Sequence, residues 1–144
     1  MQVVTIVLAA EEDELPLIGE SNAPLDEWSG IEATGLDTLK VATLHCLLTG
    51  DSMQMALDLY EPAYVSAGET VVLRLADELL ERLAALDGDA LENVASELAA
   101  TEEFERDHWD AEAVFDQISE LSGLAQLAES QGQVLFVWIY FVEA

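Results

Sequence analysis

The segment QVLFVWIYFV at 133–142 constrains the fold more than any other part of the chain. It follows a glycine and is rich in β-branched and aromatic residues, which favours a β-strand over a helix. Alternate residues of a strand point to opposite faces of the sheet, and both sets are apolar here. The segment is therefore predicted to be a central strand that is covered on both faces. The alternative is that one face forms an aromatic pocket wall or a dimer contact, which leaves both a monomer and a homodimer open.

The other predicted elements come from hydrophobic periodicity and from residues that end helices. A β-branched run at 2–8 predicts a first strand, and the stretch at 11–30, which contains Pro and Gly, predicts a loop with at most a short helix. Apolar residues at helical spacing stop at Gly50 and at Gly132, as is typical of helix ends. Four helices are expected, at 36–48, 66–86, 90–100 and 114–128.

The helix expected at 66–86 has Ser66 and Glu69 at the spacing of a capping box, which predicts that it begins at Ser66. Together the predicted elements define an α+β fold class. We expect a single domain over 1–144, in which a small sheet contains the N- and C-terminal strands and packs against about four helices.

Composition restricts the classes of partner. Half of the residues are apolar (51%), so a core is available, while 30 acidic residues against four basic ones give a formal net charge of −26. Four cations cannot neutralise a phosphate backbone, which excludes nucleic acid and anionic membrane surfaces as ligands. The acidic residues are spread along the chain, as expected for a solvated surface; an acidic face for a basic protein partner and adaptation to high salt are the alternatives.

The location is inferred from cysteine content and from the apolar segments. One cysteine cannot form an intrachain disulfide, and residues 1–10 contain no basic residue of the kind that starts a signal peptide. The apolar run at 134–142 is less than half of the ~20 residues that a membrane-spanning helix needs. We therefore expect a cytoplasmic protein with no membrane segment.

Three motifs occur in a specific order. They are LHCLLTG at 44–50, YEPAYVS at 60–66 followed by ADELLERLAALDGDAL, and LAESQGQVLFVWI near the end. This order resembles the YfbM-like family of small, uncharacterised bacterial proteins, a domain family of unknown function, over about 36–140. The resemblance implies a single α+β domain with its terminal strands in one sheet, and it implies no established activity. The positions that match the family's motifs are His45, Thr49 and Gly50, with Tyr60, Pro62 and Trp138 as weaker ones.

No motif indicates a metal, a cofactor or a nucleotide. Two histidines 63 residues apart and a single cysteine form no zinc signature, and neither an EF-hand loop, a Walker loop nor a Gly-x-Ser-x-Gly elbow is present. His45 and Cys46 are adjacent on a predicted helix and point about 100° apart, so they cannot form a nucleophile–base dyad. Cys46 is expected to be a small buried apolar residue.

His45 is the best single candidate for a catalytic residue, because a histidine at a helix end can titrate near neutral pH. The alternative is that its ring nitrogens hydrogen-bond backbone carbonyls or Thr49 and fix the position of the helix. Trp109, set among charged residues, is expected to be the most exposed tryptophan and a partner-binding residue.

Two hypotheses follow. The first is a non-enzymatic, acidic protein-binding domain for a basic partner, as an immunity-type inhibitor would be. The second is a small-molecule-binding protein or small enzyme that uses His45, with Tyr60 and Asp51 nearby in sequence and Thr49 beside it.

Overall fold

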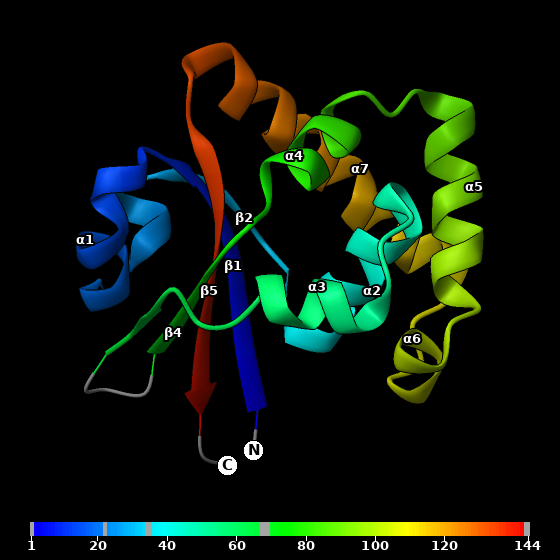
Figure 1. Ribbon diagram of the computed structural model, residues 1–144, viewed down its shortest axis with the longest axis horizontal. Helices are drawn as coiled ribbons and strands as arrows, with labels where there is room; N and C mark the ends of the chain where they lie inside the picture. Colours follow the sequence, from blue (N-terminus) through cyan, green and yellow to red (C-terminus); the bar gives the residue numbers. More distant parts are fainter. Residues whose placement is uncertain (1, 22, 34–35, 67–69, 143–144) are drawn as a thin grey trace.

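A five-stranded antiparallel sheet forms the centre of the molecule in the computed structural model, which describes residues 2–21, 23–33, 36–66 and 70–142 (Figure 1). The strand order is β2-β1-β5-β4-β3. The strands are β1 (Gln2–Ala10), β2 (Ser29–Glu32), β3 (Tyr64–Val65), β4 (Thr70–Arg74) and β5 (Val134–Val142). The sheet thus contains the first and the last strand side by side, as the sequence predicts.

Strand β5 lies in the middle of the sheet, between β1 and β4. One set of its side chains, including Leu135, Val137 and Ile139, enters the main core. The alternate side chains Phe136 and Trp138 enter a second, smaller core on the other face. The prediction of a central strand covered on both faces is therefore confirmed.

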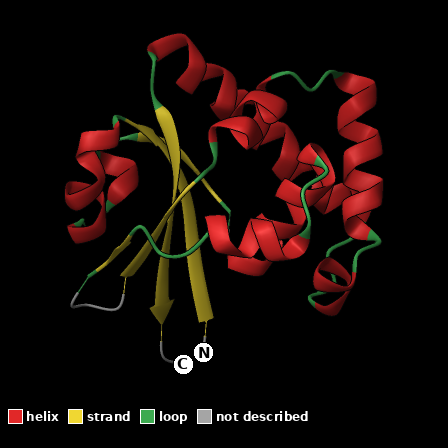
Figure 2. Ribbon diagram, in the orientation of Figure 1, coloured by secondary structure: helices red, strands yellow, loops and turns green. Residues whose placement is uncertain are grey.

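Helices cover the two faces of the sheet unequally, as Figure 2 shows. The long helix α7 (Ala111–Gln131) contacts β1, β2 and β5 on one face, and α4 (Asp77–Ala84) packs against it there. The other helices on this side of the sheet are α2 (Thr38–Thr49), α3 (Met53–Leu59), α5 (Gly88–Ala99) and α6 (Glu102–Arg106). Within the described part of the chain, the opposite face carries only α1 (Leu15–Glu20), with the 3-10 turns η1 (Glu12–Glu14) and η2 (Pro24–Asp26) beside it in sequence.

The α+β class is confirmed, although the described residues contain seven α-helices where about four were expected. Helices α2, α5 and α7 fall where the sequence predicts helices. Gly50 and Gly132 end α2 and α7 in the left-handed conformation, with φ of 84° and 68°. The Asp37 and Asp110 side chains cap the starts of these two helices.

The prediction of a single helix at 66–86 is wrong. Its first part is the strand β4, whose β-branched residues pair with β5, and the helix α4 begins only at Asp77. Ser66 instead follows β3, and its hydroxyl accepts a hydrogen bond from the Thr70 N–H at the start of β4, at 3.1 Å. Glu69, the other half of the expected capping box, lies outside the described residues.

Four short elements were not predicted: the strands β2 and β3 and the helices α3 and α6. The stretch at 11–30 holds the expected short helix, but the strand β2 begins within it and pairs with β1. The helix α6 lies in the polar segment TEEFERDHW, where Phe104 is buried and ties the helix to the core. Among the helices that the structure describes, none combines the length and the apolar character needed to cross a lipid bilayer.

Candidate functional site

His45 lies in the second half of α2, and both of its ring nitrogens have a hydrogen-bonding partner. Nδ1 lies 2.9 Å from the Tyr60 hydroxyl, and Nε2 lies 2.8 Å from a carboxylate oxygen of Asp51. The His45 and Tyr60 rings also meet edge to face, with their centroids 5.4 Å apart. Three residues that the sequence analysis names together are therefore in direct contact. We call Asp51, His45 and Tyr60 the His45 network.

The turn after α2 brings Asp51 back to the histidine ring. Gly50 takes the left-handed conformation that reverses the chain, and Thr49 holds both sides of the turn. The Thr49 hydroxyl donates a hydrogen bond to the His45 carbonyl oxygen at 2.7 Å and accepts one from the Asp51 N–H at 3.2 Å. Thr49 thus positions Asp51. The ring nitrogens bond Tyr60 and Asp51, so the expectation that they bond Thr49 or backbone carbonyls is wrong.

The hydrogen bonds of Tyr60 allow one consistent chain of donors through the network. The Tyr60 hydroxyl oxygen accepts from the Ala76 N–H at 3.4 Å, and burial raises the pKa of this phenol well above its ordinary value. The neutral hydroxyl can then donate to Nδ1 of His45, and Nε2–H donates to the Asp51 carboxylate. In this arrangement both ring nitrogens and the Tyr60 hydroxyl have a hydrogen-bonding partner.

The His45 network is closed to ligands. His45 and Tyr60 each expose 1% of their surface, and Asp51 is the member that reaches solvent, with 27% of its side chain exposed. Tyr60 ends α3, and Ala76 precedes α4, so the network joins the ends of α2 and α3 to the start of α4. This arrangement braces three helices, and a substrate or metal could reach a ring nitrogen only by displacing one of its present partners.

Cys46 packs against the main core and is half-buried. Burial raises the pKa of its thiol, and the negative charge of Asp51 raises it further. The reactive thiolate is therefore disfavoured at neutral pH, which agrees with the expected packing role.

Trp109 lies in the segment between α6 and α7, separate from the His45 network. It is half-buried, so the expectation of an exposed side chain is correct only in part. Its ring meets the buried Phe104 ring edge to face, with centroids 5.4 Å apart, and the ammonium group of Lys40 lies 5.9 Å from the Phe104 centroid. Lys40 is itself buried and pairs with Asp107, so Trp109 sits on a fixed support.

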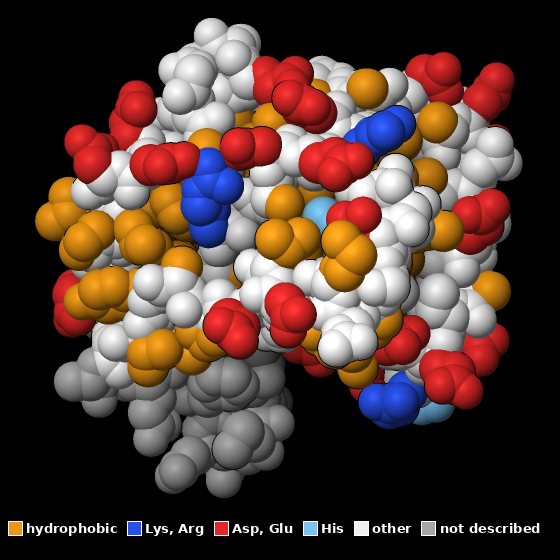
Figure 3. Space-filling view, viewed as in Figure 1, with side chains coloured by type: hydrophobic (Ala, Val, Ile, Leu, Met, Phe, Trp, Pro, Cys, Tyr) orange, Lys and Arg blue, Asp and Glu red, His pale blue; other side chains and the backbone are white. Residues whose placement is uncertain are grey.

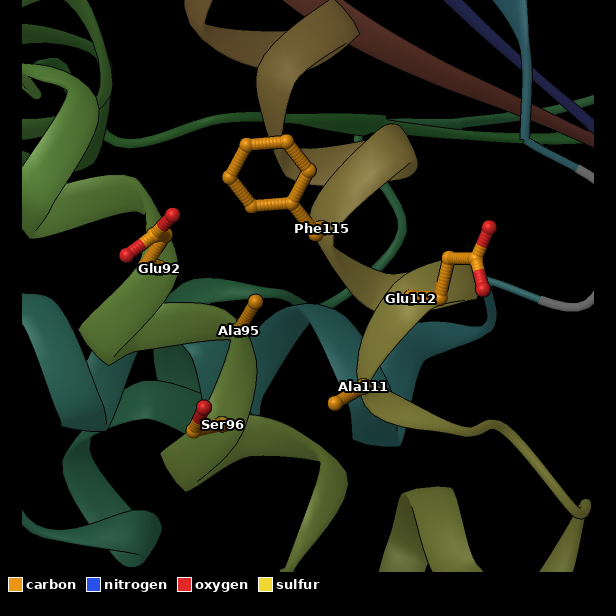
Figure 4. A pocket seen from close by; sticks show the side chains of 6 residues that line it. All are labelled: Glu92, Ala95, Ser96, Ala111, Glu112 and Phe115. Carbon is orange, nitrogen blue, oxygen red and sulfur yellow. The ribbon is translucent and has the colours of Figure 1, made fainter.

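A groove runs between α5 and the start of α7, and Trp109 is the one residue of its lining that the sequence singled out. One hollow, of about 340 Å³, is lined by residues from both helices, which Figure 4 shows: Glu92, Ala95, Ser96, Ala111, Glu112 and Phe115. A second hollow, of about 530 Å³, has Trp109 in its wall. Ser96 and Ala111 line both hollows, so the two adjoin. We call the two adjoining hollows the α5–α7 groove.

Most of the few cations of the chain are occupied by internal ion pairs. Lys40 pairs with Asp107 and with Asp37, at 3.4 Å from the latter. The other pairs are Arg74 with Glu12 and Asp77, and Arg82 with Glu78 at 4.0 Å. The surface therefore remains acidic, and Figure 3 shows acidic side chains over much of the face it views, with hydrophobic side chains gathered at its left. Within the described part of the chain, no three His, Cys, Asp or Glu side chains are grouped so that they could hold a metal ion.

The elements described above define an α+β domain in which the titratable cluster is internal and the open groove is acidic. Its structure is similar to that of YfbM from Escherichia coli, a protein of unknown function, with 13% identity and a TM-score of 0.47 over 95% of this chain and 99% of that chain. The likeness concerns the fold alone. No family model matches the chain. No curated protein matches it either.

Proposed function

We propose that this chain is a non-enzymatic, protein-binding domain that meets a basic protein partner, in the manner of an immunity-type inhibitor. The observation that carries the proposal is the unbalanced surface charge. Of the four cations, Lys40, Arg74 and Arg82 are engaged in internal ion pairs, and the formal charge of −26 is left for the surface. Such a field speeds association with a basic protein and rejects acidic ones.

The state of His45 supports a binding role over catalysis. A general base needs access to the proton that it removes, and His45 exposes 1% of its surface with both nitrogens already bonded. The alternative, a small-molecule site at His45, requires that the network opens. A His45→Gln variant tests this alternative: an unchanged ligand-induced rise in melting temperature would remove His45 from any small-molecule site.

Capture from a native lysate at low and at high salt tests the proposed function. The folded chain is used as one bait, and a Val137→Asp variant as the other. Val137 is fully buried in the central strand, so an unpaired carboxylate there is expected to unfold the chain while the rest of its acidic residues stay the same. Circular dichroism checks that this control is unfolded.

A basic protein retained by the folded bait, absent from the unfolded bait and released at high salt is the expected result. Retention of the same proteins by both baits would show a nonspecific polyanion effect and would overturn the proposal. No retained protein at either salt concentration would overturn it as well.

A further inference from the structure

We infer that the α5–α7 groove is the docking site for a basic amphipathic helix of the partner. The inference rests on the proposed function, and it adds the surface that binds and the form of the ligand. It is carried by the shape of the groove, by its aromatic and small-residue lining, and by the carboxylates on its two sides.

The lining of the groove suits apolar side chains. Phe115 lies at one end and Trp109 at the other, and both are half-buried, so each ring keeps open surface. Small side chains lie between them, including Ala95 and Ala111, and leave room for a ligand. Aromatic side chains held on a rigid support are typical anchors of protein interfaces, and Trp109 is supported by the Phe104 ring.

Carboxylates flank this lining on both sides. Figure 4 shows Glu92 on α5 and Glu112 on α7 on opposite sides of the first hollow. Glu105 and Asp110 line the second hollow beside Trp109. Glu92, Glu105 and Glu112 are exposed, and none of their side-chain carboxylates has a hydrogen bond or ion pair to another described residue. Cationic side chains on the two edges of a ligand would therefore find unpaired partners on both sides.

The form of the ligand follows from the groove's walls and length. Two helices form the walls and offer no free strand edge, so an extended segment could not add to a sheet here, whereas a helix can lie in the groove. Along α5 the groove runs from Glu92 to Ala100, which is about 12 Å, or about two helical turns. A ligand helix of that contact length presents apolar residues at i, i+4 and i+7.

Charge also decides against a second copy of this chain as the occupant. Each copy carries −26, and the groove presents carboxylates on both sides, so two copies would repel one another at this surface. A basic ligand gains from the same charges. The inferred occupant is therefore a helix with a Leu-type stripe between two edges of Lys or Arg.

The test uses a fluorescein-labelled peptide of about 14 residues with Leu at i, i+4, i+7 and i+11 and Lys elsewhere on both edges. A peptide of identical composition in scrambled, non-amphipathic order is the ligand control. Fluorescence anisotropy with the full chain is expected to give binding of the amphipathic peptide at least about tenfold tighter than that of the scrambled one.

Two variants of the chain locate the binding. Ser96→Phe fills the junction of the two hollows from an exposed position and is expected to weaken binding about tenfold or more. Ser130→Phe adds the same ring at an exposed position near the end of α7, outside the residues that line the groove, and is expected to leave binding unchanged.

A charge series adds an independent readout. The double variant Glu92→Gln/Glu112→Gln is expected to reduce the salt dependence of peptide binding, whereas the exposed pair Glu81→Gln/Glu129→Gln is expected to preserve it.

Three results would overturn the groove as the docking site: equal affinity for the two peptides, equal effects of Ser96→Phe and Ser130→Phe, or a homodimer in solution that Ser96→Phe dissociates. The first two would leave the proposed function standing if the lysate capture succeeds. Failure of that capture would instead remove the proposed function.

Discussion

The His45 network and the α5–α7 groove use polar groups in opposite ways. In the network every titratable group is matched by another protein atom, and the two rings are almost completely buried. In the groove the side-chain carboxylates of three glutamates have no hydrogen-bond or ion-pair partner among the described residues, and they lie beside half-buried rings. The residues that the sequence offers as catalytic candidates, those of the His45 network, therefore stabilise the fold. The groove, which is open to a ligand, is lined instead by glutamates beside aromatic rings.

If this contrast is correct, substitutions in the network lower the free energy of unfolding, and substitutions in the groove do not. The largest loss is expected for Tyr60→Ala. Tyr60 is one of the largest fully buried side chains, and its removal leaves a cavity and an unpaired His45 nitrogen, which together cost about 4 kcal/mol. Urea denaturation measures this loss, and a cost below about 1 kcal/mol would mean that the network does not support the helices.

A smaller loss, about 1–2 kcal/mol, is expected for Tyr60→Phe, which keeps the ring and removes only the hydroxyl. His45→Leu is expected to cost about 2–3 kcal/mol, because it leaves the buried Tyr60 hydroxyl and the Asp51 carboxylate without the imidazole. The double variant should cost less than the sum, since it leaves no unmatched group between the two positions. Strict additivity of the two losses would show that the hydrogen bond contributes nothing.

The ion pair of Lys40 with Asp107 supports the wall of the groove from inside, and its contribution depends on pH. The hydrogen bond from Lys40 holds the pKa of Asp107 below its ordinary value of 3.8. A carboxylate with a lowered pKa in the folded state stabilises above the unfolded pKa, and this contribution is lost as the pH falls through the folded pKa.

Comparison with Asp107→Asn measures that contribution. The Asp107 side chain is 46% exposed, so solvent screens the pair and the difference between the two proteins should be about 1 kcal/mol. It should stay constant from pH 7 to about pH 5 and shrink below about pH 4. A difference that grows as the pH falls would contradict the assignment of the pair.

The smallest effect on stability is expected for Ser96→Phe in the groove. The side chain is exposed, so the added ring should change the free energy of unfolding by less than about 0.5 kcal/mol. The same variant is the one expected to lose peptide binding. A large loss of stability would place Ser96 in the packed interior and would remove the contrast between the two regions.

The sequence predicted those elements whose local signals agree with their packing. The strand β5 was recognised by two apolar faces, and α2 and α7 by apolar stripes that end at Gly50 and Gly132. The prediction was wrong where the same run of residues is compatible with both a helix and a strand. The run Thr70–Arg74 fits the stripe of the helix after it, and only pairing with β5, which is distant in sequence, makes it a strand.

The candidate sites were predictable to different degrees. The sequence placed Asp51 and Tyr60 near His45 along the chain, but the turn at Gly50 and the direction of α3 decide that all three touch. The groove could not be predicted from the sequence, because its two walls come from separate helices and most of its lining residues are alanines, serines and glutamates common on any helix surface. Only Trp109, among its lining residues, had been singled out from the sequence.

The pairing of β1 with β5 has a consequence for how the chain folds. These central strands come from opposite ends of the chain, with Gln2 opposite Val142 and Ala10 opposite Val134. Closing so long a loop has a high entropic cost before the pairing contributes any stability, whereas the helices between the strands form from local contacts. During refolding, the helical circular dichroism signal should therefore appear early and Trp138 should become buried late. The overall folding rate should be lower than that of a helical bundle of this length.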